Sequence, residues 1–136
     1  LRTGGFCHLD ATMVTQGLAA LAVNELDLVI IENVGNLVCP AEFDTGAHKN
    51  VMILSVPEGD DKPLKYPLMF SVCDVLLINK SDYLSQGDFD VSALRRRVLA
   101  LNPRIVILEV SCKTGSGLEA WIDWLKGAVA AVRGPR

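Results

Sequence analysis

The sequence predicts an α/β protein: a three-layer, mainly parallel β-sheet with helices on both faces. Four short apolar runs rich in β-branched residues lie at 28–31, 51–54, 75–78 and 105–108, and none alternates apolar with polar residues. Continuous apolar runs are typical of strands covered on both faces, as in a parallel sheet between helices. Helical patterns lie between and after these runs, which gives the βαβ units from which such sheets are built.

Four segments carry the helical patterns. Apolar residues recur at spacings of three and four over 11–22 and over 91–101, and Pro103 ends the second of these helices. A shorter helix is expected over 63–72, with its two prolines in the first turns. The last helix, over 116–132, is expected to begin with a Ser-x-x-Glu capping box and to carry one apolar stripe.

The composition is that of an ordinary soluble domain. The 136 residues are 50% hydrophobic and 21% charged, with a net charge of −3. This balance argues against a nucleic-acid partner, and the Arg95-Arg96-Arg97 triplet suits the solvated face of a helix. No run reaches the roughly 18 apolar residues of a membrane helix, no signal peptide is visible, and the four cysteines lack disulfide spacing. We therefore expect a cytoplasmic protein with neither nucleic acid nor membrane as its partner.

Polar motifs follow the third and fourth apolar runs, at the edge where ligands bind in open α/β sheets. The first motif is Asn79-Lys80-Ser81-Asp82, and the second is Ser111-Cys112-Lys113. Each motif by itself is also compatible with a polar turn after a strand. Their pairing, one βαβ unit apart, favours a site for a guanine base.

The chemistry of guanine explains these residue types. The Asp82 carboxylate can accept hydrogen bonds from the N1–H and 2-amino groups of guanine, and adenine does not offer this pair of donors. The stem of Lys80 can lie over the base, Asn79 can tie the two loops together, and backbone N–H groups near Cys112 can meet the guanine O6.

An acidic residue ends the first apolar run. Glu32 precedes Gly35 by three residues, an arrangement that resembles the Walker B and third GTPase motifs. In those motifs the carboxylate holds Mg²⁺ and the glycine N–H senses the γ-phosphate. The alternative is a carboxylate that only caps the strand.

Cys7, His8 and Cys39 are candidate metal ligands. Two thiolates and an imidazole suit Ni²⁺ or Zn²⁺. An adjacent Cys-His pair cannot be told from chance by itself, and a cysteine in a loop is usually structural, so residue types alone leave both interpretations open.

Longer strings of sequence resemble a known family. They are Cys-His-Leu-Asp-Ala at 7–11, the thirteen-residue string Glu-Asn-Val-Gly-Asn-Leu-Val-Cys-Pro-Ala-Glu-Phe-Asp at 32–44, Glu-Gly-Asp-Asp-Lys-Pro-Leu-Lys-Tyr-Pro-Leu-Met-Phe at 58–70 and Ile-Asn-Lys-Ser-Asp at 78–82. Together they are similar to the HypB family of hydrogenase nickel-incorporation proteins, nickel-delivery GTPases of the SIMIBI P-loop class. The similarity covers nearly the whole chain.

This resemblance implies an activity, cofactors and partners. Members bind GTP with Mg²⁺, hydrolyse it slowly, and use the cycle to gate dimerisation and metal release. Nickel then passes toward the large subunit of [NiFe] hydrogenase, with a partner metallochaperone of the HypA type. The resemblance implies that Cys7, His8 and Cys39 bind nickel or zinc at a homodimer interface. It leaves the catalytic groups unassigned.

One part of the family pattern does not occur in the sequence. The family begins with Gly-x-x-Gly-x-Gly-Lys-Thr on a first strand, which lies centrally in the sheet between the Glu32 strand and the 51–54 strand. Gly4-Gly5 has no following Lys-Ser or Lys-Thr. We therefore expect residues 1–136 to be a partial GTPase (G) domain, truncated at its N-terminus, without the first strand and the P-loop. Alone it is expected to bind GTP poorly and not to hydrolyse it measurably.

Three other interpretations are compatible with the sequence. The first is a urease-accessory GTPase, whose metal motif reads Cys-Pro-His, whereas Cys7 and His8 are adjacent here. The second is a non-enzymatic metal-binding dimerisation module that keeps Cys7, His8 and Cys39. The third is a degraded fragment with neither activity.

Overall fold

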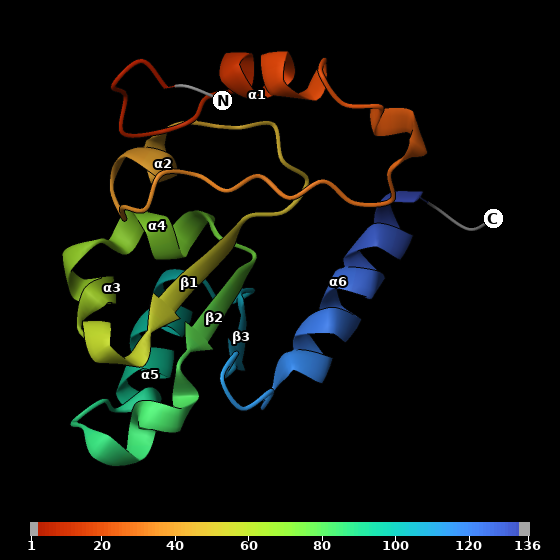
Figure 1. Cartoon of the computed structure of the whole chain (residues 1–136). Helices are drawn as coiled ribbons and strands as arrows, with labels where there is room; N and C mark the ends of the chain where they lie inside the picture. The colour runs from red at the N-terminus through yellow and green to blue at the C-terminus, as the bar shows by residue number, and fades with distance from the viewer. Residues whose placement is uncertain (1–2, 134–136) are drawn as a thin grey trace. The chain divides into compact units, whose positions relative to one another are not determined.

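The chain divides into two compact units, 1–48 and 49–136. The computed structural model describes residues 3–133 (Figure 1). The first unit contains α1 (Ala11–Leu18), the short 3₁₀ helix η1 (Val23–Glu25) and α2 (Cys39–Glu42). The second contains β1 (Val51–Ser55), η2 (Val56–Glu58), α3 (Lys62–Lys65), α4 (Pro67–Val72), β2 (Val75–Asn79), η3 (Ser81–Gln86), α5 (Val91–Leu101), β3 (Val106–Glu109) and α6 (Leu118–Arg133).

The second unit is built on a three-stranded parallel sheet. The strand order is β1-β2-β3, and the register pairs Val51 with Val75 and Val75 with Val106. Each strand therefore ends at the same edge, where the polar motifs follow. This sheet confirms the predicted parallel α/β architecture.

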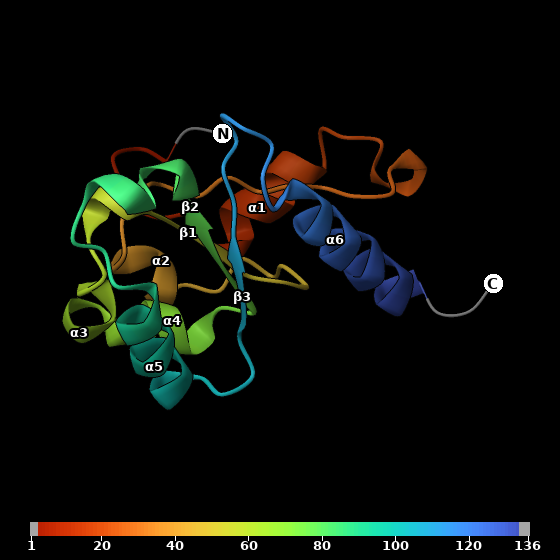
Figure 2. The ribbon, with the colours of Figure 1, turned by 90° about the horizontal axis from the view of Figure 1, so that it is seen from below.

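Helices cover both faces of this sheet (Figures 1 and 2). Successive side chains of a strand point to opposite faces. Val75 and Leu77 belong to a core cluster against which Trp121 of α6 packs. Leu76 and Ile78, both fully buried, point to the other face, where α3, α4 and α5 lie. Burial on both faces explains why the β2 sequence is continuously apolar.

Two predicted helices are shorter or broken in the structure. The helix expected over 11–22 ends at Leu18, one residue after Gly17, whose low helix propensity weakens the last turn. The helix expected over 63–72 is split into α3 and α4. Tyr66 separates them with φ −133° and ψ 57°, because a residue that precedes a proline is disfavoured in the helical region.

The last helix starts two residues later than expected, and without the predicted capping box. Gly117 precedes α6 with a φ of 74°, and the Ser116 backbone N–H donates to the Thr114 hydroxyl. A reciprocal capping box is present instead at η2, between Ser55 and Glu58. No helix within residues 3–133 combines the length and apolarity that crossing a bilayer requires.

The strand predicted at 28–31 is absent from the structure. The segment is irregular, Ile30 is 76% exposed, and no backbone hydrogen bond among the described residues involves residues 28–31. A strand exists only when a neighbour completes its ladder. Within residues 3–133 no strand pairs with this segment, so its apolar composition alone does not make it a strand.

Candidate nucleotide and metal sites

The two polar loops meet at the carboxyl edge of the sheet. The Ser81 backbone N–H donates to the Val110 carbonyl at 3.1 Å. The Ser111 hydroxyl donates to Asp82 Oδ1 at 2.6 Å. These two bonds link the loops, a role that the sequence assigned to Asn79. The Asn79 side chain instead accepts a hydrogen bond from the Lys80 backbone N–H at 2.7 Å.

Asp82 is held by a buried serine and faces an exposed lysine. Ser111 is fully buried and also accepts a hydrogen bond from the Thr114 backbone N–H at 3.3 Å. The Asp82 side chain is 16% exposed, and its Oδ2 lies 3.9 Å from Nζ of Lys113, whose side chain is 76% exposed. Serine thus fixes the orientation of the carboxylate, while the second oxygen has only a distant partner. A carboxylate in this state can accept hydrogen bonds from a ligand.

The backbone of both loops has features that suit a flat polar ligand. Lys80 is in the left-handed region at φ 59° and is the one non-glycine residue with positive φ among those described. Such strain in a lysine is typical of functional loops. In the second loop, no described hydrogen bond uses the backbone N–H of Cys112 or Lys113. These groups are available to an acceptor such as a purine oxygen.

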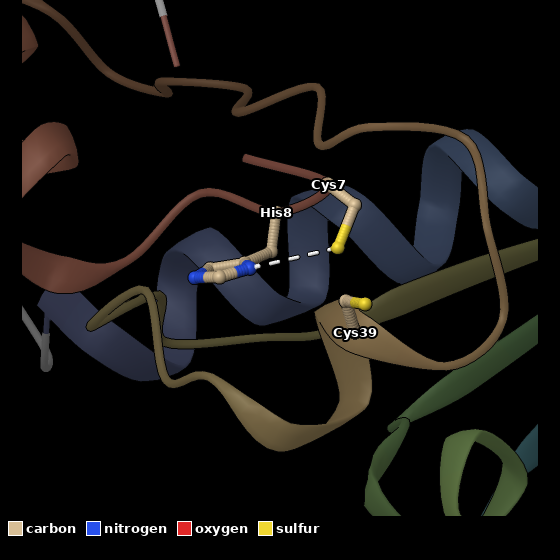
Figure 3. A group of neighbouring side chains, drawn as sticks. All are labelled: Cys7, His8 and Cys39. Atoms are coloured by element: carbon tan, nitrogen blue, oxygen red, sulfur yellow. Dashed lines mark hydrogen bonds between the residues drawn. The ribbon is translucent and has the colours of Figure 1, made fainter. Parts of the chain in front are cut away.

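Three soft donor groups lie together within the first unit. The ligand atoms of Cys7, His8 and Cys39 are all within 4.8 Å of one another, and Cys7 Sγ is 4.0 Å from His8 Nδ1 (Figure 3). Cys39 is the first residue of α2, whereas Cys7 and His8 precede α1. The fold therefore brings together the three metal-ligand candidates of the sequence.

The donor set fits a metal ion of the zinc type. Donors on a tetrahedral ion with bonds of about 2.0–2.3 Å lie roughly 3.5–3.8 Å apart, so a contraction of about 1 Å would close the cluster on an ion. The side-chain hydrogen bond with Cys7, followed by burial, raises the pKa of Cys39. Because the ligating form of cysteine is the thiolate, binding would release protons.

Aromatic rings support the histidine of this cluster. The rings of His8 and Phe43 are stacked, with centroids 3.5 Å apart and planes inclined by 6°, and Phe6 lies at 5.7 Å in a tilted contact. His8 is 8% exposed. The residues that surround the donors, Phe43 and the asparagines Asn33 and Asn36, were not identified from sequence, although the Asn-x-x-Asn spacing around Gly35 was a visible signal.

Glu32 and Gly35 are both exposed in the first unit. Nothing lies within 4 Å of the position that a Gly35 Cβ would occupy. Their assignment to Mg²⁺ and the γ-phosphate stays a prediction.

The arginine triplet and the Glu58–Phe70 string contribute to structure in the second unit. Arg95 pairs with Glu109 at 3.0 Å, and Arg97 pairs with Asp60. Asp60 also accepts a hydrogen bond from the Asp90 backbone N–H at 2.7 Å. This bond, followed by the one from Arg97, lowers the pKa of Asp60. Two of the three arginines are therefore engaged within the unit.

Comparison with known proteins adds the family. Residues 1–109 match the model of the nucleotide-binding domain described as CobW/HypB/UreG. The chain belongs to the CobW/HypB/UreG family. Within that family it is similar to the hydrogenase maturation factor HypB of Azotobacter vinelandii, with 51% identity over 126 residues, which are 93% of this chain and 42% of the relative. The chain thus spans less than half the length of this CobW/HypB/UreG relative.

Solved structures of the family share the fold. The crystal structure of the hydrogenase maturation factor HypB from Archaeoglobus fulgidus matches with a TM-score of 0.88 at 43% identity, over 95% of this chain and 63% of that one. The structure of HypB from Helicobacter pylori in complex with nickel matches with a TM-score of 0.88 at 40% identity, over 93% of this chain and 61% of that one.

Proposed function

We propose that this chain is part of a GTP-binding metallochaperone that delivers nickel during [NiFe] hydrogenase maturation. In this proposal the second unit binds the guanine base through Asn79, Lys80, Asp82 and the Ser111–Lys113 loop. The first unit holds Ni²⁺ or Zn²⁺ on Cys7, His8 and Cys39. The observation that carries the proposal is the coexistence of these two sites, a serine-held carboxylate at a sheet edge and a three-donor cluster, in one chain of this family.

The cofactor and partner roles extend this proposal. Glu32 and Gly35 would face Mg²⁺ and the γ-phosphate of GTP, and GTP hydrolysis would be the enzymatic activity of the whole protein. The three donors leave a fourth position of a tetrahedral ion open, which a second copy of the chain would fill in a homodimer. A HypA-type metallochaperone and the hydrogenase large subunit would be the cytoplasmic partners.

A second candidate function follows from the position of the cluster. All three donors come from residues 7–39, so the first unit can bind metal without any contribution from a nucleotide. In this alternative the chain is a non-enzymatic nickel- or zinc-binding dimerisation module. Nickel binding by a chain whose Asn79–Asp82 and Ser111–Lys113 loops give no response even to millimolar guanine nucleotide would favour it.

Calorimetric titration with NiCl₂ and, separately, with GTP tests the proposal. We expect nickel binding by the wild-type chain and its loss in Cys39→Ala, because two donors hold the ion much less well than three. We expect GTP binding weaker than micromolar, because the sequence contains no glycine-rich phosphate loop to hold the phosphates. Nickel binding that survives in Cys39→Ala would contradict the metal assignment, and micromolar GTP affinity would contradict the predicted dependence on that loop.

A further inference from the structure

Asn36 joins the two segments that carry the metal donors. Its side-chain N–H donates to the Cys7 carbonyl at 2.7 Å. Its Oδ1 accepts from the backbone N–H of Cys39 at 2.9 Å and from that of Val38 at 3.1 Å. A single amide thus contacts the backbone of both cysteines, which are 32 positions apart in the sequence.

Asn33 makes a second link on the other side of His8. Its Oδ1 accepts from the Leu9 backbone N–H at 2.8 Å and from the Val34 backbone N–H at 2.8 Å. Leu9 is buried. The carbonyl before His8 and the N–H after it are therefore both anchored to the Asn33–Asn36 segment.

The backbone does not supply this connection. Among residues 3–48, no backbone–backbone hydrogen bond joins the 3–10 segment to the 32–44 segment. Apart from the contact between the Cys7 and Cys39 thiols themselves, the polar links between these segments, among the described residues, are the side-chain bonds of the two asparagines. Small displacements of ligating segments change the geometry that a metal ion meets, and tolerances in such sites are about 0.5 Å.

Resting on the metal-binding function proposed above, we propose that Asn36 is the positioning residue of the Cys7–His8–Cys39 site, with Asn33 as its auxiliary. The Asn36 amide sets the separation of the two thiols. Only a side chain with a donor and an acceptor on one short stem can do this, because the Cys7 group is a carbonyl and the Cys39 group is an N–H. Aspartate has the acceptor and lacks the donor.

Asn36→Asp distinguishes the positioning of Cys7 relative to Cys39 from a role that is limited to the turn before α2. The carboxylate can still accept from Val38 and Cys39, so the turn that leads into α2 keeps its hydrogen bonds. The bond to the Cys7 carbonyl is lost, and two acceptors then face each other. We expect Co²⁺ affinity to fall by about tenfold or more, as is typical when a residue that orients metal ligands is changed.

The test uses Co²⁺ as a spectroscopic probe of the full 136-residue chain. Competition with a chromophoric chelator gives the affinity, and the thiolate-to-cobalt absorption band reports sulfur ligation directly. Asn24→Ala, at an exposed position in η1, is the matched control and is expected to leave both unchanged. Asn36→Asp is expected to lower the affinity and to weaken the band per bound ion.

The outcomes separate this inference from the proposed function. If Cys39→Ala binds Co²⁺ with wild-type affinity, the metal site itself is wrong. If Cys39→Ala loses Co²⁺ and a folded Asn36→Asp keeps wild-type affinity and band intensity, the positioning role is overturned. If Asn36→Asp does not fold, Asn33→Ala tests whether the asparagine side chains position the metal donors. A severalfold loss of Co²⁺ affinity supports the proposal, and an unchanged Co²⁺ affinity overturns it.

Discussion

Exchange of Asp82 for asparagine should change which purine the second unit prefers. Guanine donates two hydrogen bonds to a carboxylate, whereas the asparagine side chain offers one acceptor and turns a donor toward the other guanine donor. A hydrogen bond to a charged group contributes about 1.5–3 kcal/mol. Loss of one such bond predicts a fall in GMP affinity of about 10- to 150-fold. Xanthine has a carbonyl where guanine has its 2-amino group, so XMP should bind the variant better than GMP does.

The structure indicates that this variant will fold. The buried Ser111 hydroxyl donates to Asp82 Oδ1, and an asparagine Oδ1 can accept the same bond. We expect the free energy of unfolding to change by about 1 kcal/mol or less, because the hydrogen bond persists and only the negative charge of its acceptor is removed. Any change in purine preference can then be assigned to the ligand contact.

Amide NMR titration is the suitable assay, because millimolar binding is measurable in a chain of 14.7 kDa. GMP, XMP and AMP are titrated into the wild type, Asp82→Asn and the control Asp88→Asn, which makes the same charge change at an exposed position after η3. Wild-type shifts are expected in residues 79–83 and 111–115 with GMP and not with AMP. Equal responses to GMP and AMP, or an unchanged GMP preference in Asp82→Asn, would refute the assignment.

Three further predictions concern stability and reactivity. The hydrogen bond from the Asp90 N–H lowers the pKa of Asp60 in the folded protein. Ionised Asp60 therefore stabilises the fold at pH values above the unfolded pKa of about 3.9, and this contribution is lost as the pH falls through the lower folded pKa. Asp60→Asn should make the free energy of unfolding less dependent on pH in this acidic range. Burial raises the pKa of Cys73 to about 11, so at pH 8 a thiol reagent should modify it far more slowly than the other cysteines. Gly117→Ala would place a Cβ against the Glu109 carbonyl at positive φ and should cost on the order of 3 kcal/mol in urea unfolding.

Sequence periodicity predicted the elements whose packing partners lie within the chain. The β2 run at 75–78 is covered on both faces, and α5 spans 91–101 as expected, with Asp90 capping its first turn at Ala93. In both elements the pattern, the cap and the tertiary contacts agree. The sheet edge and the meeting of its two polar loops followed from the rule that parallel strands end at one edge.

Periodicity failed where structure depends on a partner or on one dihedral angle. Residues 28–31 have the composition of a buried strand, but composition does not show whether a second strand is present to pair with them. The break at Tyr66 required the restriction that a proline places on the preceding residue. Asn33 and Asn36 could not be assigned from sequence, because their hydrogen bonds reach 24 and 29 positions along the chain.

X-ray absorption at the zinc edge of the Zn²⁺-loaded chain tests most directly whether Cys7, His8 and Cys39 form one metal site. Sulfur scatterers at about 2.3 Å and nitrogen at about 2.0–2.1 Å are predicted, with the sulfur contribution reduced in Cys39→Ala. A spectrum with only oxygen and nitrogen neighbours, or one that Cys39→Ala leaves unchanged, would contradict the site.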